Sequence, residues 1–196
     1  MGNMARELTG QLVTFGLGGS APSASLLERL QIRSGASVLY LGSPGPGSLE
    51  SLAGHVGPSG TITVVDEDAS AIEAARRLVI DRHLTNVEVL QRATWRGLFD
   101  AQSFDVVHVH GSLAAVPRRR RRRLVRHAIR LAKPGGWIVS RERRSALDRS
   151  PWTAIRLFSA CGLHVVSTEP ACDGALDTPA GGSSLEYLVW GRRAVL

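Results

Sequence analysis

The stretch Ser37–Asp66, SVLYLGSPGPGSLESLAGHVGPSGTITVVD, determines the fold that this sequence predicts. An apolar strand over 38–41 is followed by a turn of glycines and prolines, and then by a helix with apolar residues at positions 49, 52, 53 and 56. Gly57 and Pro58 end the helix, and a second strand over 62–65 ends in Asp66. A glycine turn that leads into a helix, with an acid after the next strand, is typical of sites that hold nucleotide-like ligands.

The rest of the chain continues to alternate between helices and strands. We expect a parallel sheet, because strands that are joined through helices pair in parallel by right-handed crossovers. The last two strands have no helix between them, so the final strand should run antiparallel to its neighbours. The predicted helices cover 71–78, 124–132 and 153–160, and the predicted strands cover 87–90, 104–110, 137–140, 164–168 and 185–190.

The sequence therefore predicts one α/β domain over residues 25–196, with seven mostly parallel strands and helices on both faces of the sheet. Residues 1–24, in which Gly10, Gly16, Gly18 and Gly19 interrupt any long helix, are expected to form an N-terminal arm or flap, followed by a helical stripe of Leu26, Leu27 and Leu30. Between the last two strands, residues 170–184 are rich in glycine and proline and are expected to form a loop over the site.

The composition limits the class of protein. A chain of 196 residues with 43% hydrophobic residues suits a single domain with its own core, and no apolar run is long enough to span a membrane. The formal net charge of +7 favours acidic partners. The two cysteines, Cys161 and Cys172, have no metal-ligand spacing, so we expect neither a metal site nor a disulfide framework, and a cytoplasmic location.

The ordered set of motifs resembles the class I methyltransferases that use S-adenosylmethionine. The motifs are the G-x-x-G-x-G turn at 42–47, Asp66 after the second strand, the FDVV strand at 104–107 and the KPGG turn at 133–136. The resemblance covers roughly residues 25–193, and it implies a Rossmann-like methyltransferase fold with S-adenosylmethionine as cofactor. By this resemblance the cofactor is lined by Gly42, Ser43, Gly45, Gly47 and Asp66, with Thr94 near the adenine.

Simpler interpretations of these residues remain open. The glycines can form an ordinary tight turn, and Asp66 can be an acid that caps the next helix. The sequence also departs from the family pattern, which usually has an acid where Tyr40 stands, a turn one residue shorter without Pro44 and Pro46, and an acid within 92–94. These departures favour, as an alternative, a methyltransferase-like protein without methylation activity that serves as a partner subunit or catalyses another reaction.

Two residues at predicted strand ends are candidates for catalysis. His110 ends the fourth strand, where an imidazole can take a proton at neutral pH, although it can also be a histidine bonded to loop backbone. Glu142 follows the fifth strand and is expected to orient the substrate, or else to be a solvated acid. His108 lies on the same face as His110 and is expected to be buried and hydrogen-bonded.

Six consecutive arginines, Arg118–Arg123, form the most unusual charge pattern. Positive charge at a helix start opposes the helix dipole, so we expect the run to be partly loop and fully solvated. The run can be an ordinary solvated helix start in an arginine-rich protein, or it can provide a surface for RNA or for an acidic protein, without aromatic residues for base stacking. We favour a small-molecule substrate of specialised metabolism, with an RNA-modifying or RNA-binding protein as an alternative; a homo-oligomer is also compatible with the sequence.

Overall fold

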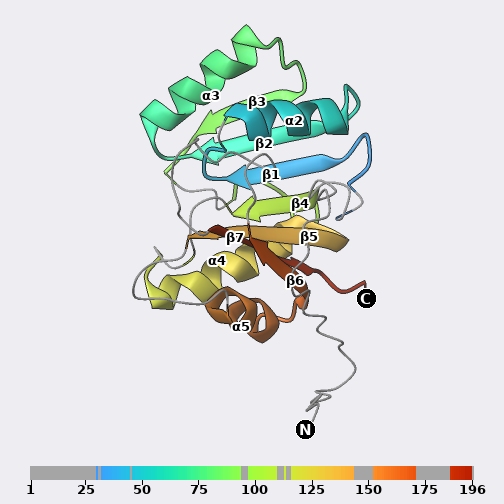
Figure 1. Ribbon diagram of the computed structural model, residues 1–196, viewed down its shortest axis with the longest axis vertical. Coiled ribbons are helices and arrows are strands. Elements are labelled where there is room, and N and C mark those ends of the chain that lie inside the picture. The colour runs from blue at the N-terminus through green and yellow to red at the C-terminus, as the bar shows by residue number, and fades with distance from the viewer. Residues whose placement is uncertain are drawn as a thin grey trace, which may run out of the picture.

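The computed structural model describes residue 30, residues 32–44, 46–93, 97–109, 113, 116–143, 152–170 and 186–195. These residues form a layered α/β fold in which a central sheet separates two pairs of helices (Figure 1). The strands are β1 Ser37–Leu41, β2 Thr61–Asp66, β3 Val87–Gln91, β4 Phe104–Val109, β5 Ala132–Arg143, β6 His164–Pro170 and β7 Glu186–Arg192. The helices are α2 Pro46–Val56, α3 Ala69–Asp81, α4 Arg118–Leu131 and α5 Trp152–Ala160.

The sheet has seven strands in the order β3-β2-β1-β4-β5-β7-β6. The pairs from β3 to β5 are parallel, and β7 is antiparallel to both β5 and β6. This confirms the predicted mostly parallel sheet with an antiparallel final strand. Because β1, β2, β4 and β5 run in the same direction, the residues that follow them meet at one edge of the sheet, which we call the carboxyl edge.

Both faces of the sheet are covered, as predicted. On one face, α2 buries an apolar stripe against β1, and α3 packs beside it. On the other face, α4 and α5 pack against the opposite side chains of the same strands. Alternate residues of β1 enter different cores: Val38 and Tyr40 pack against α2, and Leu39 and Leu41 lie in the core under α4 and α5.

The arginine run corrects one expectation. Arg118–Arg123 is helical throughout as the first part of α4, and it is not fully solvated, because Arg121 is half-buried and donates to the carbonyl of Val116. The helix begins on the carbonyl of Pro117, which accepts from the amide of Arg120 at 2.7 Å. Opposition to the helix dipole costs about 0.3–1 kcal/mol per residue, whereas each buried large apolar side chain contributes about 1.5–3 kcal/mol. Burial of the apolar face of α4 therefore outweighs the unfavourable charge at its start. The fully buried residues of this face are Val125, Ala128 and Leu131.

Other boundaries differ less. Helix α2 begins at Pro46, three residues before the first apolar position of the predicted helix, so Gly47 lies in its first turn, and proline is a favoured first helical residue. The predicted KPGG turn is part of β5, but it leaves the ladder with β4. Phe104 pairs with Ala132 and Val106 pairs with Trp137, so residues 133–136 bulge outward.

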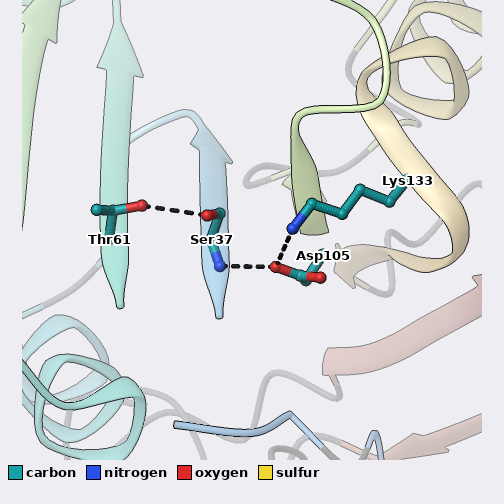
Figure 2. A network of polar contacts seen from close by, with 4 residues as sticks. All are labelled: Ser37, Thr61, Asp105 and Lys133. Carbon is teal, nitrogen blue, oxygen red and sulfur yellow. Dashed lines mark hydrogen bonds and ion pairs between the residues drawn. The ribbon is translucent and has the colours of Figure 1, made fainter. Parts of the chain in front are cut away.

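A polar network connects strands at the edge of the sheet opposite the carboxyl edge, which we call the amino edge (Figure 2). The Asp105 carboxylate accepts hydrogen bonds from the amide of Ser37 and from Nζ of Lys133, each at 2.8 Å. The Thr61 hydroxyl extends the network to β2 by donating to the Ser37 hydroxyl at 3.3 Å. Asp105 thus links β1, β4 and the bulge of β5. The ion pair with Lys133 is partly exposed, so we expect it to contribute at most about 1 kcal/mol.

Several predicted segments lie outside the described residues. These are the arm over 1–24, the stripe residues Leu26 and Leu27, and the loop except for Pro170, which ends β6. The proposed domain boundary at residue 25 stays a prediction. Within the described ranges, none of the helices combines the length and the apolar character needed to cross a membrane.

A pair of glycines tests the packing around α2. A Cβ atom added at Gly60 would lie 2.7 Å from the carbonyl oxygen of Val56 and 2.8 Å from that of Ala36, and both are backbone atoms. We expect Gly60→Ala to lower the free energy of unfolding by about 1–3 kcal/mol, measured by urea denaturation. Gly54→Ala is the matched control, since nothing lies within 4 Å of its added Cβ and alanine favours the helix by about 1 kcal/mol. Equal stability of Gly60→Ala and the wild type would contradict this packing.

Candidate functional site

The glycine turn after β1 is held against the end of β2. Gly42 has a φ of +102°, a conformation that glycine adopts without steric cost, and its amide donates to the carbonyl of Val65 at 2.8 Å. The amide of Ser43 donates to Oδ2 of Asp66 at 2.7 Å, and the Ser43 hydroxyl donates to the carbonyl of Ala71. The turn therefore has a fixed position beside the strand end that carries the acid.

Asp66 is half-buried at the tip of β2 and does not cap the next helix. Its other oxygen, Oδ1, accepts from the amide of Asp68 at 3.0 Å. Asp68 itself is the N-cap of α3, since its carboxylate accepts from the amides of Ser70 and Ala71. These bonds, with one from the Ser70 hydroxyl as the largest cause, lower the pKa of Asp68 below its ordinary value. The interpretation of Asp66 as a helix cap is therefore wrong.

Tyr40 forms a buried polar cluster with two residues that the sequence did not bring together. Tyr40, Ser48 and His108 are each less than 5% exposed. The Tyr40 ring lies 4.6 Å from the His108 ring, centroid to centroid, and its hydroxyl is 3.5 Å from the Ser48 hydroxyl at the start of α2. The burial expected for His108 is confirmed. Tyr40 thus occupies the place where the family usually has an acid.

Register explains this cluster. Tyr40 and His108 are direct partners in the pairing of β1 with β4, so their side chains lie on the same face. The sequence contains both residues at matching strand positions, but only the pairing of the first strand with the fourth makes them neighbours. The alternation pattern together with a strand order would have been sufficient to find the pair.

Glu142 is buried on the face that α4 and α5 cover, so the interpretation as a solvated acid is wrong. Its Oε1 accepts from the amide of Leu113 at 3.1 Å and from the hydroxyl of Ser140. Leu113 follows β4 after the segment that contains His110, and it is fully buried. The carboxylate therefore links the tip of β5 to the chain that leaves β4.

The remaining predicted site residues differ in what can be said of them. Gly47 lies in the first turn of α2, while Gly45, Thr94 and His110 fall outside the described residues. At the end of β3, Arg92 and Ala93 are exposed, and the Arg92 amide donates to the carbonyl of Asp66 at 2.8 Å. Positions 92 and 93 thus bring no carboxylate to this side of the site.

Two further observations concern other kinds of site. In the part of the chain that the structure describes, no group of three or more histidine, cysteine, aspartate or glutamate side chains is placed to hold a metal ion.

A cavity of about 450 Å³ opens at the amino edge, and its lining includes Arg33, Asp105, Lys133, Trp137 and Arg192. It lies away from Asp66 and the glycine turn, which belong to the carboxyl edge.

Comparison with known proteins adds independent information. The sequence matches the family model of a methyltransferase domain over residues 38–136, which is half of the chain. A comparison with curated protein sequences gives no match.

The fold is similar to several solved structures. An S-adenosylmethionine-dependent methyltransferase from Aquifex aeolicus has a TM-score of 0.66 and 18% identity, over 87% of this chain and 88% of that chain. One from Methanosarcina mazei has a TM-score of 0.67 and 16% identity, over 88% of this chain and 99% of that chain. The cyclase SpnF has a TM-score of 0.67 and 16% identity, over 87% of this chain and 78% of that chain. At these identities the structures establish the shared fold.

The family match extends from β1 to the bulge of β5, so it includes the glycine turn, Asp66 and the cluster around Tyr40. Sequence family and strand order agree, and we conclude that this chain belongs to the class I S-adenosylmethionine-dependent methyltransferases.

Proposed function

We propose that this chain transfers the methyl group of S-adenosylmethionine to a small molecule of specialised metabolism, at the carboxyl edge of the sheet. The observation that carries the proposal is the position of Asp66. Its carboxylate is fixed at the strand tip beside the Gly42 turn, with each oxygen accepting one backbone amide. A carboxylate has about four acceptor positions, so capacity remains for the two ribose hydroxyls of the cofactor.

The residues fit the adenosine part of the cofactor better than its amino-acid part. Gly42 and Ser43 allow close approach of the backbone, and the amides of the first turn of α2 favour a carboxylate group. The ammonium group of the cofactor's methionine part would find the hydroxyls of Tyr40 and Ser48 in place of the usual acid. When bound, S-adenosylmethionine supplies an electrophilic methyl group on a sulfonium centre. The chain's own residues then orient the acceptor and remove its proton where the acceptor is a hydroxyl.

The choice of a small molecule follows from the sequence after β4. Family members that methylate exocyclic amines carry an N/D-P-P-aromatic element there, whereas this chain has His110, Gly111, Ser112 and Leu113. His110 comes directly after Val109, the last residue of β4, and we assign it the role of base or orienting group.

A second candidate is another reaction in the same site. Tyr40 is buried against His108 where the family usually has an acid, and SpnF, which shares the fold, is a cyclase. Under this alternative the chain binds the cofactor without transferring its methyl group.

Cofactor binding is tested at Asp66. Loss of the charged acceptor in Asp66→Asn should weaken binding of S-adenosylmethionine and S-adenosylhomocysteine about 10- to 100-fold, because a hydrogen bond to a charged group contributes about 1.5–3 kcal/mol. Isothermal titration calorimetry measures both affinities. Glu67→Gln removes the same charge from the adjacent exposed residue and should leave them unchanged. A wild-type protein that gives no heat with either ligand at millimolar concentration would leave the proposal without support.

The acceptor class is tested with S-adenosylmethionine that carries a labelled methyl group. Cell extract is separated into small-molecule, nucleic-acid and protein fractions, and each is incubated with the enzyme. We expect label in the small-molecule fraction, and we expect His110→Gln to reduce its rate at least about 100-fold with cofactor affinity unchanged. His83→Gln, at an exposed position after α3, is the control. Label in the nucleic-acid fraction would contradict the small-molecule assignment, and cofactor binding without label in any fraction would favour the second candidate.

Glu142 is proposed as a positioning residue. The hydrogen bonds from the Leu113 amide and the Ser140 hydroxyl end on the same oxygen, so the carbonyl oxygen of Glu142→Gln can accept them, whereas Glu142→Ala leaves these buried donors unsatisfied. We expect the glutamine variant to keep most of the methylation rate and the alanine variant to lose about 1–3 kcal/mol of stability together with activity. Thermal denaturation and the label assay measure these effects. Equal inactivation of both variants at unchanged stability would show that the carboxylate itself takes part in the reaction.

A further inference from the structure

The exposed face of α4 carries a stripe of four arginines, Arg119, Arg123, Arg126 and Arg130. They are spaced at i, i+4, i+7 and i+11, which places them within a sector of about 60° at 100° per residue. All four are exposed, and the buried residues Val125, Ala128 and Leu131 lie on the opposite side of the helix. The stripe is about 16 Å long at 1.5 Å per residue.

The four arginines have no acidic partner among the residues that the structure describes. None of the ion pairs there involves Arg119, Arg123, Arg126 or Arg130, and the sequence of α4, RRRRRRLVRHAIRL, contains no acid. The neighbouring helix α5, WTAIRLFSA, also lacks an acid and adds the exposed Arg156. Neither helix therefore supplies a negative charge that compensates the positive charge of this face.

This arrangement costs stability. Like charges at i, i+4 destabilise a helix by about 0.2–0.5 kcal/mol per pair, and cations in the first turn oppose its dipole. By contrast, Arg193 donates to the carbonyl of Ile129 at 2.9 Å, near the end of the helix, where positive charge is favourable. A bound polyanion would remove the repulsion along the stripe.

We propose that the α4 stripe binds the phosphate backbone of a nucleic-acid duplex without reading its sequence. Arginine suits this partner because its guanidinium pairs with phosphate oxygens through two parallel hydrogen bonds. Residues 118–131 contain no phenylalanine, tyrosine or tryptophan, so the stripe has no platform on which single-stranded bases would stack. Contacts to phosphate alone fix position and carry no base specificity, so the stripe anchors the protein without deciding the methyl acceptor.

The test is the salt dependence of binding, measured by fluorescence anisotropy with labelled duplexes of about 20 base pairs, one of DNA and one of RNA. Release of counterions from four phosphates predicts a slope of log Kobs against log salt of about −3.6. A triple variant that keeps only one arginine of the stripe, Arg119→Gln/Arg123→Gln/Arg126→Gln, should reduce the slope to about −0.9. It should also weaken binding at least roughly tenfold at 100 mM salt. Binding to either duplex with these slopes supports the proposal.

The matched control is Arg76→Gln/Arg77→Gln/Arg82→Gln, which removes the same net charge from exposed positions on and after α3, beside the other end of the sheet. This control should keep the wild-type slope, and the stripe variant should melt at the wild-type temperature or above it. An equal loss of affinity in both variants would overturn the proposal. So would a wild-type slope shallower than about −2, or displacement of the duplex by polyglutamate at equal charge, which would indicate an acidic protein partner.

Discussion

The hydrogen bond between the Ser43 amide and the Asp66 carboxylate is the contact on which the site depends. It fastens the turn after β1 to the end of β2, two segments that are 23 residues apart in the chain. A charged acceptor makes this bond stronger than one between neutral groups. The parallel register that pairs Leu41 with Val65 brings the two ends together, and the bond then fixes the turn beside the acid.

The two edges of the sheet have different roles. At the amino edge, Asp105 links β1, β4 and β5 through backbone and side-chain donors, as Figure 2 shows. At the carboxyl edge, Asp66 and Glu142 accept backbone amides from segments that leave neighbouring strands. Under the proposed function, the contacts that stabilise the sheet and the residues that bind the cofactor thus lie at opposite ends of the strands, and the carboxyl edge can vary in chemistry while the sheet stays intact. The replacement of the usual acid by Tyr40, packed on His108, is such a variation.

The sequence predicted the fold well because its pattern is local. Apolar strands, helical periodicity and Gly-Pro stops placed most elements correctly, and the last two strands, for which the sequence predicts no connecting helix, are antiparallel as expected. The expectation of a partly loop arginine run is wrong because the charge of six residues against the helix dipole is only one contribution to the stability of α4. Burial of the apolar face of Val125, Ala128 and Leu131 outweighs it and keeps the whole of α4 helical.

The sequence by itself determined the family, the glycine turn and the acid at the end of β2, because each of these depends on residue types at short spacings. Only the tertiary structure decided how the side chains are used. Asp66 holds the turn while Asp68 caps α3, Tyr40 meets His108, and Glu142 reaches Leu113. Each of these outcomes depends on strand register or on a contact between distant segments. Both follow from the packing of the sheet against its helices, and a local pattern contains no information about them.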